Sequence, residues 1–113
     1  MKGIGGNITG EIQISTYTTN EIGERIPKWE TIQSIKGWLD YLSGEASRVN
    51  YSAKIQESTH VFVSDYVQLD SRIETESSRM VVKGKTYDIT LIDNPMELDK
   101  QLEIYLKFTG GQS

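Results

Sequence analysis

Alternating apolar and polar positions predict a series of short β-strands, and the pattern is clearest near the end of the chain. Between residues 101 and 108 every second side chain is apolar: Leu102, Ile104, Leu106 and Phe108. The other face is expected to carry Glu103, Tyr105 and Lys107. This period of two indicates a strand with one buried face.

A second pattern, over residues 80–92, predicts a β-hairpin. Residues 80–82 are apolar and lead into residues 83–85, where Gly84 can adopt the positive φ of a tight turn. The returning strand alternates as well, and its expected inward side chains are Tyr87, Ile89 and Leu91. Pro95 then ends this strand, since proline lacks the amide donor that a strand ladder uses.

The N-terminal half predicts two longer strands separated by a turn. Alternation begins near Asn7, residues 18–24 are rich in turn formers, and Pro27 is expected at the far end of that turn. The next strand is expected over residues 28–40, but its apolar positions change side along the way. A β-bulge would restore the register, and Gly37 is the expected bend at the corner of a barrel.

The middle of the chain predicts a long loop. Residues 41–58 have no sustained period and are rich in Ser, Ala, Asn and Gly, with a short helical turn allowed around residues 52–57. Residues 59–67 are typical of a central strand, and residues 69–78 form a polar connection to the hairpin.

Together these elements predict an all-β fold, a small β-barrel of about six antiparallel strands with the long loop between the second and third. The length favours a single domain over residues 1–113, with flexible ends at residues 1–6 and 109–113. The residues expected to build the barrel are Trp29, Gly37, Trp38, His60, Phe62, Gly84, Tyr87, Ile89, Leu102, Ile104 and Leu106.

Composition narrows the classes of function. A hydrophobic content of 36% predicts a small core, and the absence of cysteine excludes disulfides and thiolate metal sites. No apolar run approaches the roughly 20 residues of a membrane helix, and no signal peptide is evident, so we expect a chain that is neither exported nor inserted in a membrane. The net charge of −4, without any run of lysine or arginine, disfavours a phosphate-binding surface.

Candidate chemistry is sparse. The single histidine, His60, lies in a strand pattern without nearby metal ligands, which favours a structural role. The spacing of Asp65, Asp70, Glu74 and Glu76 is that of a solvated acidic face and not of a calcium loop.

No nucleophile elbow or phosphate-binding glycine motif occurs, so the sequence offers no support for an enzyme, a cofactor or a metal. One alternative stays open at this stage. Trp29 and Trp38 could stack on bases, which would make the chain a small barrel that binds single-stranded nucleic acid.

Two motifs in combination carry a resemblance to a known family. Residues 59–63 read Thr-His followed by three apolar residues, and residues 79–89 read Arg, three apolar residues, then x-Gly-x-x-Tyr-x-Ile. With the closing strand at residues 102–106, this order resembles the tailed-bacteriophage head-tail joining family, the head-closure or stopper proteins. An arginine that often follows the central strand in that family is absent from residues 64–66, and a tail-completion role within the same connector is the alternative.

The resemblance implies a β-barrel protein that assembles as a ring of six or twelve copies at the head-tail interface of the virion, after synthesis in the host cytoplasm. Its expected partners are other copies of itself, a portal or adaptor protein and a tail-completion protein, with genomic DNA passing through unread. The resemblance also implies that the long loop helps to close the channel. The matching residues are Tyr41, Leu42, Ser43, Gly44, Glu45, Ala46, Ser47, Arg48, Val49, Asn50, Tyr51, Ser52, Ala53, Lys54 and Ile55.

Overall fold

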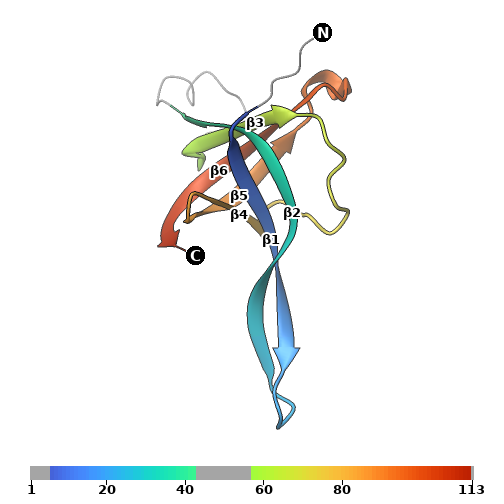
Figure 1. Ribbon diagram of the computed structural model, residues 1–113, viewed down its shortest axis with the longest axis vertical. Coiled ribbons are helices and arrows are strands. Elements are labelled where there is room, and N and C mark those ends of the chain that lie inside the picture. The colour runs from blue at the N-terminus through green and yellow to red at the C-terminus, as the bar shows by residue number, and fades with distance from the viewer. Residues whose placement is uncertain (1–5, 43–56, 113) are drawn as a thin grey trace.

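The computed structural model describes residues 6–42 and 57–112, which form a closed sheet of six antiparallel strands (Figure 1). The strands are β1 (Ile8–Thr19), β2 (Arg25–Tyr41), β3 (His60–Asp65), β4 (Ser78–Val82), β5 (Lys85–Asp93) and β6 (Gln101–Gln112), with one turn of 3-10 helix, η1 (Pro95–Glu97). Their order around the barrel is β1-β2-β3-β6-β5-β4. The prediction of an all-β fold with six antiparallel strands is therefore confirmed.

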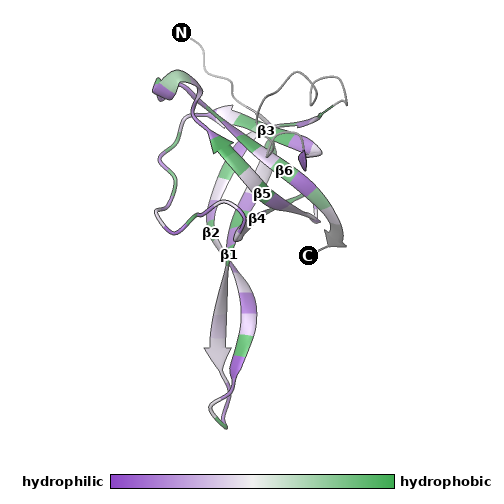
Figure 2. Cartoon of the chain, turned by 180° about the vertical axis from the view of Figure 1, so that it is seen from behind, coloured by the Kyte–Doolittle hydropathy of each residue, from purple (hydrophilic) through white to green (hydrophobic). Residues whose placement is uncertain are grey.

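One apolar cluster fills the barrel. Its fully buried members are Ile12, Ile35, Phe62, Met80, Val82, Tyr87, Ile89, Ile104 and Leu106. Hydrophobic and hydrophilic residues alternate along the barrel strands in Figure 2, because successive side chains of a strand point to opposite faces. Leu102, Ile104 and Leu106 are buried as the alternation predicts.

Phe108 departs from that alternation. Its side chain is 40% exposed, because β6 has passed the start of β3 there: His60 lies opposite Leu106, so no β3 residue faces Phe108. Phe108 instead packs at the rim of the barrel against the ring of Tyr87, with the ring centroids 5.4 Å apart.

The β-bulge expected in the second strand lies at Ile32. Ile12 pairs with Gln33 and Gln13 pairs with Thr31, so Ile32 is the extra residue that moves Ile35 to the inner face. Gly37 has a different role, since a Cβ atom there would overlap the carbonyl oxygen of Val63 and crowd the Phe62 ring. β2 passes from β1 to β3 at this position, so the glycine permits a close backbone contact at the corner.

A second bulge, at Thr90, changes the predicted face of β5. Ile89 pairs with Leu106 but Leu91 pairs with Tyr105, which leaves Thr90 as the extra residue. Leu91 was expected inside, yet it joins a small outer cluster with Val61 and Tyr105, while Ile92 packs on the inner core. The sequence pattern did not reveal this bulge because Leu91 and Ile92 are both apolar.

The β4–β5 hairpin has the predicted turn, with positive φ at Gly84 (77°) and also at Lys83 (52°). The connection before it, residues 66–77, runs as a strap over one end of the barrel. Leu69 and Ile73 of this strap pack against the inner core, so it contributes to closing that end.

β1 and β2 extend well beyond the barrel as a twisted hairpin (Figure 1). β1 pairs with β4 only from Gly10 to Ile14, and residues 15–19 pair only with residues 25–29 of β2. We call residues 15–29 the arm; it contributes to a longest molecular extent of 52 Å against 31 and 24 Å in the other directions.

Pro27 lies within β2, opposite Tyr17, and not at the end of a turn as predicted. A proline is tolerated there because the other side of the arm strand has no partner strand that needs its amide donor. Within the described ranges, no helix has the length and apolar character that crossing a membrane would require.

Candidate interaction surfaces

The ends of the long loop are fixed at one rim of the barrel. Of the loop residues implied by the resemblance, Tyr41 and Leu42 are described, and residues 43–55 lie outside the described residues. Tyr41 pairs with His60, and the Leu42 amide donates a hydrogen bond of 2.9 Å to the carbonyl of Thr59. The chain therefore leaves and re-enters the barrel between adjacent strands.

An aromatic row supports this rim. The rings of Tyr41 and His60 are 5.3 Å apart, those of His60 and Tyr87 are 5.1 Å apart, and Phe108 follows Tyr87. Burial and the charge of Lys85 lower the pKa of His60, so its imidazole is mainly neutral near pH 7. The imidazole packs between Tyr41 and Tyr87 and forms a hydrogen bond with a hydroxyl group of the preceding residue.

That hydroxyl belongs to Thr59. Its Oγ1 lies 2.8 Å from Nδ1 of His60 and accepts a hydrogen bond of 2.8 Å from the amide of Phe108. The Thr59 amide in turn donates to the carbonyl of Leu106 at 2.8 Å. The end of β6 is thereby tied to the residue that follows the loop.

A buried pair of hydroxyls fixes the chain one residue earlier. The side chains of Ser58 and Thr90 share a hydrogen bond, and Thr90 Oγ1 donates to the carbonyl of Tyr105 at 3.1 Å. Thr90 can reach both because it is the bulged residue of β5. The apolar pattern alone could not have found this anchor, although a threonine within an apolar run was its one signal.

The four acidic residues noted in the sequence, Asp65, Asp70, Glu74 and Glu76, do not form a cluster that could hold a metal ion. Asp70 accepts hydrogen bonds from the backbone amide and from two guanidinium nitrogens of Arg72, which lower its pKa to about 2. Arg72 also lies 3.8 Å from Glu30. Among the described residues no group of three acidic, histidine or cysteine side chains is placed to hold a metal ion.

A cleft lies where the strap meets the root of the arm. It has a volume of about 460 Å³ and is lined by Ile32, Gln33, Gln68, Leu69, Asp70 and Ser71. Gln33 bridges its two walls, since Nε2 donates to the carbonyl of Gln68 and Oε1 accepts from the amide of Asp70. The cleft is open and mostly polar.

The two tryptophans lie outside the barrel core and far apart. Trp29 is on the arm and 42% exposed, and Trp38 is at the other end of β2, opposite Val63. Nine positions along a strand correspond to roughly 30 Å. One face of Trp29 is also covered by the guanidinium of Arg79, 4.2 Å from the ring. The two rings therefore do not form a shared platform for stacked bases.

These features define a small β-barrel whose described residues anchor one long connection at a rim and expose an arm at one end. The chain belongs to the phage head completion protein family, whose model matches residues 6–107. Membership places it among structural components of phage virions, with a role in the assembly or closure of the head.

The fold is similar to the solution structure of protein SF1141 from Shigella flexneri 2a. The two share 20% sequence identity and a TM-score of 0.68 over 96% of this chain and 97% of that one. At this identity the likeness concerns the fold alone. No curated protein matches the sequence.

Proposed function

We propose that this protein closes the filled phage head as a ring between the portal-adaptor complex and the tail, and that residues 41–55 help to retain the packaged DNA. Family membership supports the head-closure role. The observation that carries the loop assignment is the double anchor at one rim: a backbone bond from Leu42 to Thr59, and the buried hydroxyl pair of Ser58 and Thr90. Because both ends are fixed by the barrel itself, the barrel strands on either side do not need the residues between these ends to hold them together.

The charge of the chain is compatible with a conduit. A net charge of −4 repels phosphates, whereas a basic groove would hold the DNA and slow its passage. This acidic balance, with the separation of Trp29 and Trp38, argues against a module that binds single-stranded nucleic acid.

Loop replacement tests this proposal. Residues 43–55 are replaced by a short Gly-Ser linker, and the variant is supplied to phage particles that lack the wild-type protein. We expect a folded barrel, shown by unchanged near-ultraviolet circular dichroism, and heads that lose most of their nuclease-protected DNA.

Lys83→Ala, in the exposed β4–β5 turn, serves as the control and should retain DNA as wild type does. Heads that stay full without the loop would remove the retention claim. If the wild-type protein neither closes heads nor joins them to tails, the proposed head-closure role itself is wrong.

A further inference from the structure

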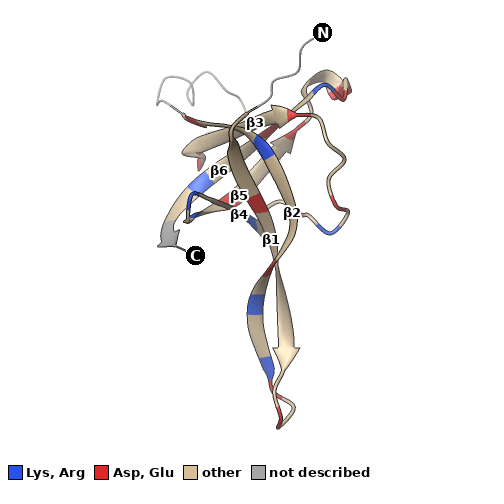
Figure 3. Cartoon of the chain, viewed as in Figure 1, with Lys and Arg blue, Asp and Glu red and all other residues tan. Residues whose placement is uncertain are grey.

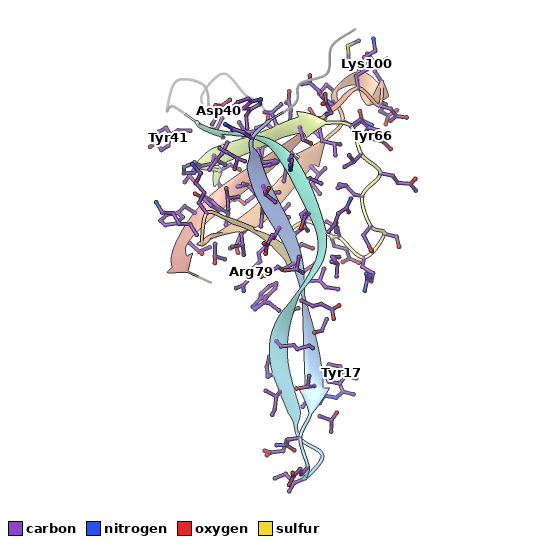
Figure 4. The ribbon with its side chains drawn as sticks, viewed as in Figure 1. Tyr17, Asp40, Tyr41, Tyr66, Arg79 and Lys100 are labelled. Atoms are coloured by element: carbon purple, nitrogen blue, oxygen red, sulfur yellow. The ribbon has the colours of Figure 1, made fainter. Side chains whose placement is uncertain are left out.

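Two cation–aromatic pairs lie on one side of the arm, and Arg79 of β4 supplies the cation of the second. The guanidinium of Arg25 lies 4.4 Å from the centre of the Tyr17 ring, and that of Arg79 lies 4.2 Å from the Trp29 ring. In the register of β1 with β2, Ser15 faces Trp29 and Tyr17 faces Pro27, so these aromatic residues share the outer face of the hairpin. Figure 4 shows Tyr17 on the lower part of the arm and Arg79 at its root.

The aromatic side chains of the arm are not part of the barrel core. Tyr17 is 53% exposed and Trp29 is 42% exposed, and no arm residue belongs to the buried cluster inside the barrel. Tryptophan, tyrosine and arginine are the residue types that contribute most at protein interfaces. The outer face of the arm thus has the composition of a docking surface.

The opposite end of the molecule carries a complementary surface, which we call the acidic loop, residues 93–103. Met96 is 86% exposed and Leu98 is 55% exposed around η1. Its carboxylates are Asp93, Glu97, Asp99 and Glu103, with Lys100 as the one cation. Figure 3 shows mostly acidic positions on the segment around η1, whereas the arm, at the other end of the molecule, has basic positions along β2 and acidic positions at its tip.

The carboxylates of the acidic loop accept hydrogen bonds from neutral groups, Glu103 from Gln101 and Tyr105 and Asp99 from Asn94, but form no ion pair among the described residues. Asp93 lies directly opposite Glu103 in the β5–β6 register, an arrangement that like charges make unfavourable. Within the described residues, neither of these two nor Glu97 or Asp99 forms an ion pair with a lysine or arginine. A cationic partner would relieve this repulsion.

We propose that the arm of one copy docks on the acidic loop of the next copy. Arg25 and Arg79 match the carboxylates in charge, and the faces of Tyr17 and Trp29 match the exposed Met96 and Leu98, because thioether and aliphatic groups pack well on aromatic rings. The two surfaces differ and lie at opposite ends, so the contact is head-to-tail, the type that closes into a ring when the rotation permits. This inference rests on the proposed ring and names the surfaces that build it.

Engineered disulfides test the contact, since the natural chain has no cysteine to interfere. The variant carrying both Tyr17→Cys and Leu98→Cys is concentrated to millimolar levels and exposed to a mild oxidant. We expect a ladder of covalent multimers on a denaturing gel, because each copy offers one thiol to each neighbour. Mixing the two single variants should stop the ladder at dimers.

Thr18→Cys combined with Leu98→Cys is the matched control. Thr18 is adjacent to Tyr17 but faces the other side of the ribbon, opposite Ile26, so no ladder is expected. Absence of a ladder from the Tyr17 and Leu98 pair, or an equal ladder from the control, overturns the proposal.

A nucleic-acid role for the same face is the competing outcome. In a Trp38→Phe background Trp29 is the only tryptophan, so selective tryptophan excitation reports on this residue alone. Saturable quenching by an oligonucleotide at low salt, abolished by Arg25→Glu, would assign the arm to nucleic acid and overturn self-docking. If the protein completes heads but the cysteine variant gives no ladder, the arm contact is wrong and the head-closure role stands. If the cysteine variant gives a ladder but the protein cannot complete heads, the arm contact stands and the head-closure role is wrong.

Discussion

At the scale of single residues, Gly37 shows how the absence of a side chain permits a close contact between two strands of the barrel. The residue sits where β2 changes partner from β1 to β3, and the Val63 carbonyl occupies the space that a Cβ atom would need. Because that obstacle is backbone, it cannot rotate away. The sequence marked this glycine as a bend, and its role is a close contact between strands.

We therefore expect Gly37→Ala to lower the free energy of unfolding by roughly 2–4 kcal/mol. Gly10→Ala is the control, since its Cβ would meet the flexible side chain of Met80, which can move, and the expected loss is below about 2 kcal/mol. Urea unfolding of both variants measures the difference. Equal losses at the two positions would contradict this explanation.

His60 links stability to pH in a direction that its surroundings determine. Burial and Lys85 lower the pKa of the folded state below the ordinary value of 6.5, so the unfolded chain binds the proton more readily. The stabilisation is complete above pH 6.5 and is lost as the pH falls towards the pKa of the folded state. His60 is the only histidine of the chain, so the effect can be isolated.

Urea unfolding at about pH 7.5 and about pH 5.5 should show lower stability at the acidic value, before most carboxylates titrate. His60→Phe keeps an aromatic ring between Tyr41 and Tyr87 and should make the two measurements nearly equal. A wild-type protein as stable at the lower pH as at the higher one would refute the assignment.

At the scale of elements, the arm is separable from the barrel. Ile12 and Ile35 are buried members of the core on β1 and β2, and the hairpin beyond them is largely exposed. At its tip, Asn20 accepts hydrogen bonds from the amides of Ile22 and Glu24, which makes the turn self-contained. The barrel does not depend on the arm for its packing.

Excision of the arm tests this separation. Joining Ser15 to Trp29 through Asn-Gly removes residues 16–28 and provides a two-residue hairpin turn between paired positions. We expect a cooperatively folded monomer with core methyl signals in nuclear magnetic resonance spectra close to those of wild type. A molten or unfolded product would show that the arm supports the barrel after all.

The same elements show what the sequence could and could not predict. Strand alternation located Leu102, Ile104 and Leu106 correctly, and Gly84 marked the β4–β5 turn, because both signals are local. The sequence indicated a bulge in the second strand without its position at Ile32, and it did not indicate the bulge at Thr90, since register depends on the partner strand and not on the strand's own pattern. Each slip changes which face the following side chains occupy.

At the scale of the whole molecule, the acidic loop and the arm illustrate a second limit. Asp93 and Glu103 are ten positions apart in the chain, and only the β5–β6 register makes them opposite. The turn formers at residues 18–24 indicated the β1–β2 turn, but only the register of the two strands brings Tyr17 and Trp29 to one face. The resemblance of two short motifs identified the family, whereas the surfaces depended on pairing that no motif records.

The closure of the barrel also has a consequence for how the chain folds. The β1–β2 and β4–β5 hairpins join neighbours in sequence, but the ring closes only when Gly10 meets Val82 and Ile14 meets Ser78. Bringing such distant segments together has a large entropic cost before any contact stabilises it, and folds dominated by such pairings are slow. Until β4 arrives, β1 exposes an open edge, and β3 must likewise pair with the distant β6, so newly made chains are most exposed to aggregation before these two long-range pairings form.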